Sequence, residues 1–286
     1  MFFNNYNKPG KGVNKRDPNQ PRITTFFEIL PRKVWNLCKV NMLHMLIGIP
    51  FFLVAMLVTG VISSRITNSL FVSLGDPSLE PTFALLDLGL RVVLSLLFTI
   101  FYGLGPATAG ATYIIRNYGR EEHCWLVSDF FEKFRQNFKQ SFCVWIIDLA
   151  LLFLMTVAIE FYMNTGIYIL AFILVFVAIV YTLMHLYIYQ LIITFELPLK
   201  HILKNSLIFA LAKAPKNFLL LLITMLVHIV IPVAVVVITQ SVIAVLAIVL
   251  LELLILPSLT SFMTNFFIYS DIEQYIKLAL ESKIEE

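Results

Sequence analysis

Six long apolar runs constrain this chain more than any other feature of its sequence. A membrane span needs about 20 mostly apolar residues. The predicted spans cover residues 41–62, 83–115, 142–163, 167–195, 217–238 and 241–268. Only 14% of the residues are charged and 59% are hydrophobic, whereas a soluble domain carries about 25% charged residues. The sequence therefore predicts an all-α, polytopic membrane protein with six transmembrane helices.

The spans divide the chain into three predicted parts. Residues 1–22 are polar, without the apolar core of a signal peptide, and are expected to form a disordered cytoplasmic tail. Residues 23–270 form the six-helix transmembrane domain, and residues 271–286 form a cytoplasmic C-terminal segment.

The positive charges predict the orientation. Nineteen of the 21 Lys and Arg residues lie in the N-terminal segment, the second and fourth loops between spans, and the C-terminus; only Arg65 and Arg91 lie on the other side. Loops rich in Lys and Arg stay in the cytoplasm. We expect a multi-pass protein of the cell membrane with both termini cytoplasmic.

The chain can be divided into three units, each of one amphipathic segment followed by two predicted spans. The amphipathic segments cover residues 23–40, 125–140 and 199–214, and the short turns at 163–167 and 238–241 predict antiparallel hairpins. Such segments lie in the membrane interface with their basic residues toward anionic headgroups. Two interpretations stay open: a threefold repeat of hairpins, or the general habit of membrane helices to begin with Lys and Asn.

The middle amphipathic segment gives the clearest interfacial pattern. Phenylalanines recur every four residues between basic side chains, and Asp129 with Glu132 predicts a helix start. The predicted interfacial residues are Phe130, Phe134, Arg135, Asn137, Phe138 and Lys139.

Small residues crowd the inner end of the second predicted span. Gly103, Ala107 and Ala111 are spaced by four, so on one helix they would share a face and let a neighbouring backbone approach. The predicted packing or partner-binding residues are Gly103, Gly105, Pro106, Ala107, Gly110 and Ala111. A tight packing seam is the simpler explanation, and a substrate path beside the proline is the alternative.

The same region resembles the YesL family of bacterial membrane proteins. The matching features are LGPATAG at 104–110, Arg116, WLVSDFF at 125–131, FRQNFKQ at 134–140, KNS at 204–206, PKN at 215–217 and Asn41. The resemblance covers residues 25–270 and implies a Gram-positive source and a gene beside carbohydrate ABC importers. It therefore implies a role in carbohydrate uptake without an established enzymatic activity.

Four ionisable side chains fall inside predicted spans, where such residues are functional candidates by default. His228 and Glu252 lie at similar distances from the turn near residue 240, and Asp148 and His185 lie at similar depths in the preceding hairpin. Each pair is expected to face its partner, either as a buried polar clamp or as a group that couples protons or contacts substrate.

Motifs of common enzymes and cofactor sites are missing from the sequence. There is no HExxH, GxSxG, Walker or GxGxxG motif, and Cys38, Cys124 and Cys143 form no metal-like cluster. We expect no enzyme, no cofactor, no metal and no nucleic-acid partner.

The leading functional hypothesis is a non-enzymatic membrane protein that assists or regulates carbohydrate uptake. Its expected partners are membrane lipids and the subunits of an ABC importer or another membrane protein. The alternative is a transporter in its own right that uses the polar residues near mid-membrane. A membrane-embedded hydrolase or transferase is a third class.

Overall fold

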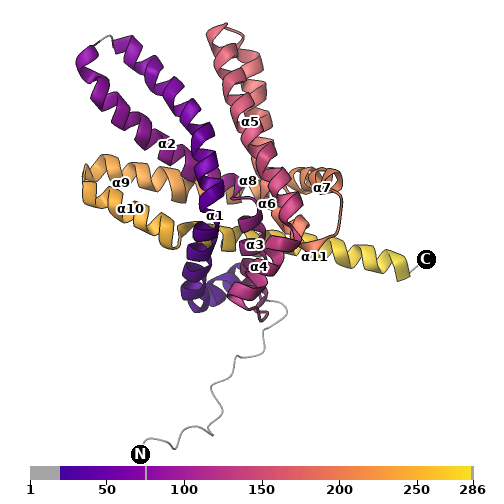
Figure 1. Ribbon diagram of the computed structural model, residues 1–286. Coiled ribbons are helices and arrows are strands. Elements are labelled where there is room, and N and C mark those ends of the chain that lie inside the picture. Colours follow the sequence, from indigo (N-terminus) through magenta and orange to yellow (C-terminus); the bar gives the residue numbers. More distant parts are fainter. Residues whose placement is uncertain (1–19, 75, 285–286) are drawn as a thin grey trace, which may run out of the picture.

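The computed structural model describes residues 20–74 and 76–284, and the regular elements within these ranges are helical (Figure 1). The longer helices are α1 (Arg22–Leu74), α2 (Glu80–Tyr102), α3 (Pro106–Arg120), α4 (Leu126–Gln136), α5 (Phe138–Asn164), α6 (Tyr168–Thr194), α7 (Leu199–Ala212), α8 (Ala214–Met225), α9 (Ile231–Thr239), α10 (Val242–Leu254) and α11 (Leu256–Ile284). A 3₁₀ turn (Pro77–Leu79) precedes α2, and a π-helical turn (Leu226–Val230) joins α8 to α9.

Several helices suit a membrane. Among the described residues, five helices are long and apolar enough to cross a bilayer, or six if α10 and α11, bent by 48°, count as one span. Their large apolar side chains face outward: Ile238 is 81% exposed and Ile243 is 78% exposed. Soluble proteins rarely leave such surface open to water. The long apolar helices indicate a multi-pass membrane protein.

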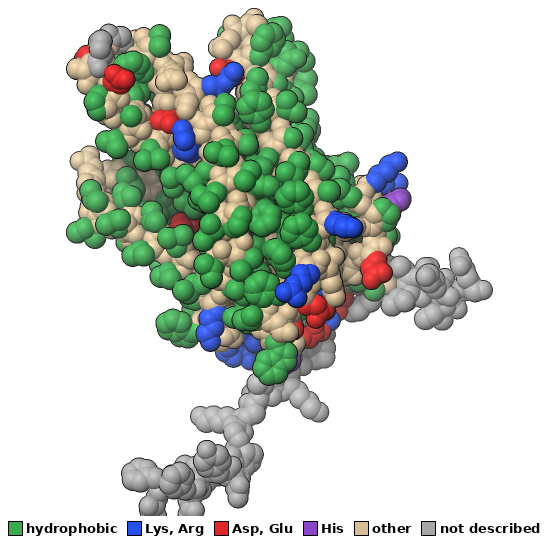
Figure 2. Space-filling view, in the orientation of Figure 1, with side chains coloured by type: hydrophobic (Ala, Val, Ile, Leu, Met, Phe, Trp, Pro, Cys, Tyr) green, Lys and Arg blue, Asp and Glu red, His purple; other side chains and the backbone are tan. Residues whose placement is uncertain are grey.

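The buried centre of the molecule is α3. This helix packs against α1, α4, α6 and α11, and most of its side chains are buried. The helix pairs α1/α2, α5/α6 and α9/α10 extend away from this centre in different directions (Figure 1). Apolar side chains cover most of the visible surface, and several Lys and Arg side chains lie at the end where α3 and α4 meet (Figure 2).

The prediction of one continuous helix over 83–115 is wrong, because the chain breaks at residues 103–105 between α2 and α3. Gly103 (φ +85°) and Gly105 (φ +58°) take backbone conformations that L side chains rarely adopt. Pro106 then begins α3, where its missing N–H costs no helical hydrogen bond. Proline therefore starts a new helix here and does not kink a continuous one.

The predicted amphipathic segments differ in their outcome. Residues 23–40 are part of the continuous helix α1, and Phe26 stacks on Phe262 of α11 with ring centroids 5.5 Å apart. Residues 199–212 form the separate helix α7. Residues 126–136 form α4, which begins after Trp125 and not at Asp129; the Asp129 carboxylate instead accepts the backbone N–H of Trp125 at 2.8 Å.

Of the last two predicted spans, the first is one helical stretch, Ala214–Thr239, with a π-helical turn inside it, and the second is made of two pieces bent by 48°. The run over 217–238 lies in α8, the π-helical turn and α9, and the run over 241–268 lies in α10 and α11. Pro257 stands in the first turn of α11. Residues 1–19 of the predicted tail lie outside the described residues, and α11 continues without interruption past the predicted boundary at residue 270.

Candidate functional site: a polar cavity among the helices

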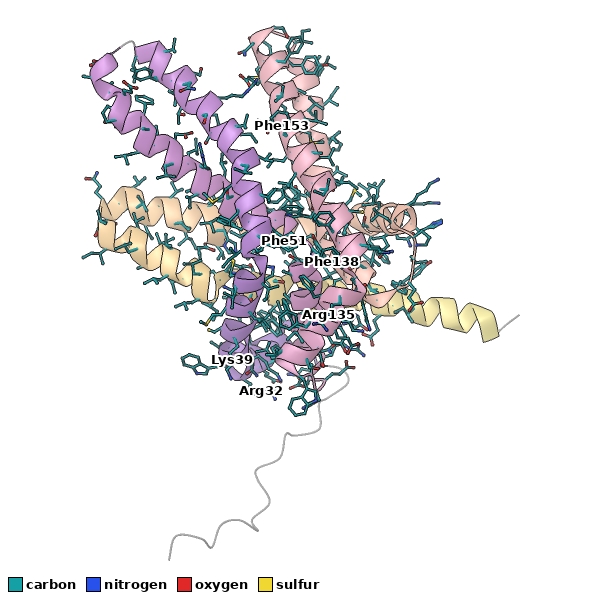
Figure 3. All side chains as sticks on the ribbon, viewed as in Figure 1. Arg32, Lys39, Phe51, Arg135, Phe138 and Phe153 are labelled. Carbon is teal, nitrogen blue, oxygen red and sulfur yellow. The ribbon has the colours of Figure 1, made fainter. Side chains whose placement is uncertain are left out.

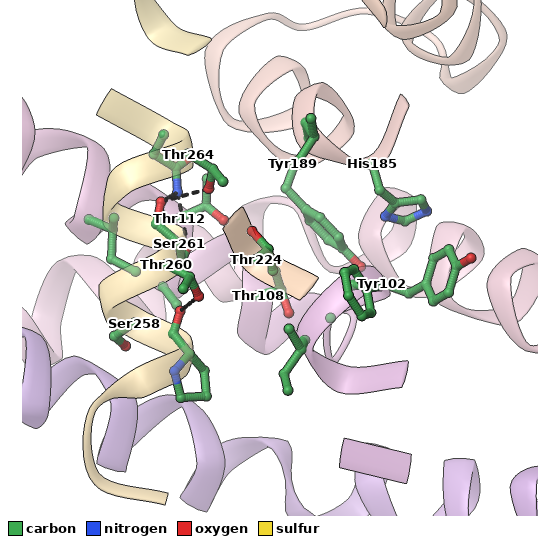
Figure 4. Close-up of a pocket in the computed structure, with 18 of the residues that line it drawn as sticks. Tyr102, Thr108, Thr112, His185, Tyr189, Thr224, Ser258, Thr260, Ser261 and Thr264 are labelled. Carbon is green, nitrogen blue, oxygen red and sulfur yellow. Dashed lines mark hydrogen bonds between the residues drawn. The ribbon is translucent and has the colours of Figure 1, made fainter. Parts of the chain in front are cut away.

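A polar cavity of about 120 Å³ lies where α1, α2, α3, α6, α8 and α11 meet (Figure 4). Nine of its lining residues are Ser or Thr, and Asn41, Gln190 and Asn265 add amides. None of its lining residues is Asp, Glu, Lys or Arg. The cavity is therefore polar but carries no permanent charge.

Several of these hydroxyl groups already donate their hydrogen to their own helix. A threonine in a membrane helix can donate its hydroxyl hydrogen to the carbonyl four residues earlier. Donor–acceptor distances of 2.9–3.1 Å show this for Thr99, Thr182, Thr224 and Thr260. Their oxygens can then only accept further hydrogen bonds, so these parts of the wall suit a molecule that donates O–H or N–H groups.

The break between α2 and α3 forms one side of the cavity. The hydroxyl oxygen of Thr108 accepts the backbone N–H of Leu104 at 2.6 Å and lies 3.1 Å from Nε2 of His44. His44 belongs to α1 and lines the cavity. The irregular backbone is thus held by a side chain of its own helix and by one from a neighbouring helix.

The break between α10 and α11 is held from the same helix α1. Nδ2 of Asn41 donates to the carbonyl oxygens of Glu252 (3.2 Å) and Leu253 (2.7 Å). The hydroxyl of Ser258 donates to Oδ1 of Asn41 at 3.0 Å. Asn41 and His44 are one turn apart, so a single turn of α1 holds both broken helices.

The structure brings His228 and Glu252 together beside the cavity. Nδ1 of His228 lies 2.9 Å from the Glu252 carboxylate, and Nε2 lies 2.9 Å from the hydroxyl oxygen of Thr260, which lines the cavity. The order acid, histidine, hydroxyl matches that of hydrolytic triads. However, the hydroxyl of Thr260 also donates to the Leu256 carbonyl of its own helix, which is the arrangement of a polar clamp between helices.

Asp148 and His185 also meet. Nε2 of His185 lies 2.7 Å from Oδ1 of Asp148, which also accepts the hydroxyl of Tyr181 at 2.6 Å. Nδ1 of His185 is buried without a hydrogen-bond partner in the described part of the chain. His185 lines the cavity and Asp148 does not, so the histidine separates the carboxylate from the cavity.

The predicted small residues serve different purposes. Gly103 lies in the break and lines the cavity, so it does not share a helix face with Ala107 and Ala111, which are buried in α3. A Cβ atom on Gly110 would lie 2.8 Å from the carbonyl oxygen of Phe130, so this glycine lets α4 approach α3. Gly105 and Pro106 complete the turn into α3.

The predicted interfacial residues do not all face outward. Phe130 is fully buried against α3, which corrects its expected place in the lipid interface. Arg135 and Phe138 lie near the junction of α4 and α5 and are exposed, as is Lys139 (Figure 3). The side-chain amide of Asn137 donates to the Lys133 carbonyl at 3.0 Å and ends α4. Phe130 packs in the interior because Gly110 of α3 has no side chain and leaves room for it.

Most residues of the cavity wall were missed by the sequence analysis. The signal that could have found them is the density of hydroxyl and amide side chains in apolar helices, above all in PSLTSFMTN at 257–265. His44 was also missed, although it is a histidine within a predicted span. In the described residues no three His, Cys, Asp or Glu side chains converge as metal ligands.

Comparison with known proteins finds a match to a family model over part of the chain and no activity. Residues 81–159 match the model of a family described as "Protein of unknown function, DUF624". This segment spans α2, α3, α4 and most of α5, and thus includes the break between α2 and α3. No curated protein and no solved structure matches the chain.

Proposed function

We propose that this protein is a membrane carrier that binds a small, uncharged solute rich in hydroxyl groups in its central cavity. The observation that carries the proposal is the wall of nine Ser and Thr residues without any Asp, Glu, Lys or Arg. A charged solute would leave its charge unpaired there, and an apolar solute would leave the polar groups of the wall unsatisfied.

The broken helices support a carrier. Transporters commonly build their substrate sites from discontinuous helices near the middle of the membrane. Irregular backbone at that depth is tolerated where it is buried in protein or lines a cavity. Gly103 and Pro257, one from each break, both line this cavity.

Sugars and polyols are the solute class that fits best. Their hydroxyl groups donate hydrogen bonds, and the threonines that donate to their own helices can only accept. The side chains of Tyr102 and Tyr189 add aromatic surface to the wall. The carbohydrate role implied by the YesL resemblance points to the same class.

The proposed layout is three antiparallel hairpins with both termini in the cytoplasm. The contacts α1 with α2, α5 with α6 and α9 with α10 support it, as does the distribution of Lys and Arg. A cysteine introduced by Ser78→Cys should react with a membrane-impermeant maleimide on intact cells, and native Cys124 should not. The reverse pattern would overturn the orientation.

Uptake by purified protein in proteoliposomes tests the carrier. Labelled glycerol, xylose and glucose should enter faster than into empty liposomes. Thr112→Val and Thr224→Val should slow uptake severalfold, because each removes a cavity oxygen with little change in volume. Thr239→Val is the matched control, since Thr239 is exposed at the end of α9. If none of the three solutes enters the proteoliposomes faster than it enters empty liposomes, the carrier proposal is wrong.

The accessory role predicted from the family resemblance predicts a different experimental result. It requires an ABC importer for uptake, whereas a carrier moves solute alone. Purification in mild detergent with importer subunits attached, combined with no uptake by the isolated protein, would favour the accessory role.

A further inference from the structure

Arg116 differs from the other Asp, Glu, Lys and Arg side chains that are buried in the described part of the chain. Asp148 has His185, Glu252 has His228, and Asp271 is bonded by Lys216. The Arg116 side chain has no carboxylate within 4 Å among the described residues, although Arg116 is only 9% exposed. An unpaired buried charge is costly, so binding of an anion at Arg116 would stabilise the protein.

The direct contacts of the Arg116 guanidinium are all with neutral groups. Nη1 donates to the hydroxyl of Thr194 at 2.8 Å, and Nε is buried without a partner. The guanidinium lies 5.1 Å from the ring of Tyr113 and 5.7 Å from that of Tyr269. Cation–π contacts of this kind offset part of the desolvation of a guanidinium but leave its charge in place. Burial also lowers the pKa of Arg116 from its ordinary value.

Two further cations share the same tyrosines. Arg120 lies 4.9 Å from the ring of Tyr269, and Lys133 lies 5.1 Å from the ring of Tyr113. Arg120 is paired with Glu122 at 2.6 Å and Lys133 with Glu132 at 3.4 Å, so the uncompensated charge of this cluster centres on Arg116. The three cations and the two carboxylates paired with them leave one positive charge in excess.

The position of the cluster indicates which anion it meets. Thr194, the partner of Arg116, is the last residue of α6, a helix apolar enough to span the membrane. Arg116 therefore lies level with the end of a span, at the depth where lipid phosphates stand. Guanidinium groups bind phosphate oxygens in bidentate fashion through neighbouring N–H groups. Nε of Arg116 is buried, and Nη2 makes no hydrogen bond within the described part of the chain, so the terminal nitrogens are the ones left to meet a phosphate.

We propose that Arg116, Arg120 and Lys133 form a binding site for a phosphate group, supplied by an anionic phospholipid of the leaflet that faces α3 and α4. The proposal is independent of the carrier function. A free phosphate would present the same chemistry, and the experiment separates the two sources.

Thermal unfolding of the full chain in a nonionic detergent tests the site. Added phosphatidylglycerol should raise the Tm of the wild type by about 2–4 °C, the shift expected for about 1 kcal/mol in a chain of this size class, and phosphatidylcholine should not. A second arm compares inorganic phosphate with chloride at equal ionic strength. A shift in the lipid arm assigns the site to lipid, and a shift with inorganic phosphate alone assigns it to a soluble phosphate.

The variants decide whether Arg116 is responsible. Arg116→Gln should abolish the anion-dependent shift while leaving the lipid-free Tm equal to or above that of the wild type, since it removes an unpaired buried charge. A merely structural arginine would instead lower the lipid-free Tm and keep the shift. Arg65→Gln is the matched control, because Arg65 is exposed and pairs with Glu160 far from the cluster.

Two results would overturn the proposal: no anion-dependent shift in the wild type, or an equal shift in Arg116→Gln. If that variant does not fold, Arg116→Lys keeps the charge but not the bidentate geometry and should weaken the shift. Native mass spectrometry of the wild type should then show retained phosphatidylglycerol in preference to phosphatidylcholine, and equal retention would count against the site.

Discussion

Nδ2 of Asn41 donates a 2.7 Å hydrogen bond to the carbonyl oxygen of Leu253. In a continuous helix this carbonyl would accept the N–H of residue 257, but residue 257 is a proline and has no N–H. A side chain on α1 therefore replaces a main-chain donor in a helix more than two hundred residues away. This contact fixes the α10/α11 break, which borders the cavity.

Asn41→Leu should lower the free energy of unfolding by about 1–3 kcal/mol, because the buried carbonyls of Glu252 and Leu253 lose their donor. Thermal unfolding in detergent measures the loss. Asn68→Leu on the exposed face of the same helix is the control and should change the stability little. Equal effects in the two variants would show that the asparagine does not hold the break.

Gly110→Ala should destabilise the protein by about 1–3 kcal/mol, the usual cost of overpacking. The added Cβ atom would lie 2.8 Å from the Phe130 carbonyl oxygen and push α4 from α3. Gly89→Ala is the control, since a Cβ atom there meets nothing within 4 Å. Chemical denaturation should show a clear loss only for Gly110→Ala, and an unchanged midpoint would contradict the close approach.

His228 and Glu252 should be energetically coupled. Glu252→Leu or His228→Leu alone leaves a buried polar group without its partner, whereas the double variant removes both. We expect the double variant to be less damaging than the sum of the single ones, with a coupling energy of about 0.5–3 kcal/mol. Additive losses in a double-mutant cycle of thermal stabilities would show that the two side chains do not act as a pair.

The thiol of Cys124 should react slowly at neutral pH. Burial raises its pKa from the ordinary value, and only the thiolate is nucleophilic, so the folded protein holds less thiolate than the unfolded chain. With Cys38 and Cys143 replaced by Ser, the maleimide labelling rate should rise by about tenfold per pH unit and stay below that of the unfolded chain until the pH exceeds the raised pKa. Equal rates at neutral pH would contradict the burial of this thiol.

The sequence predicted the fold class because its signals are local. A bilayer requires long apolar helices, and these can be read from composition over a window of about 20 residues. The structure retains helices in each predicted span. The break at 103–105 was missed because Gly103 and Gly105 were interpreted as small packing residues, whereas their positive φ angles end one helix before Pro106 begins the next.

The pairs His228–Glu252 and Asp148–His185 could be anticipated from matching depths on consecutive helices. The cavity could not, because its wall combines six helices that lie far apart in the sequence. A single threonine in an apolar helix looks the same whether it faces lipid, a neighbouring helix or a cavity.

By itself the sequence determined where the chain is apolar and where its cations lie, since each of these depends on neighbouring residues alone. Only the tertiary structure decided that Phe130 is buried on Gly110, that Asn41 bonds a distant helix and that Arg116 has no carboxylate within 4 Å among the described residues. These features depend on which helices meet. Contacts between residues far apart in the chain determine which helices meet. The helical periodicity of the sequence does not encode these contacts.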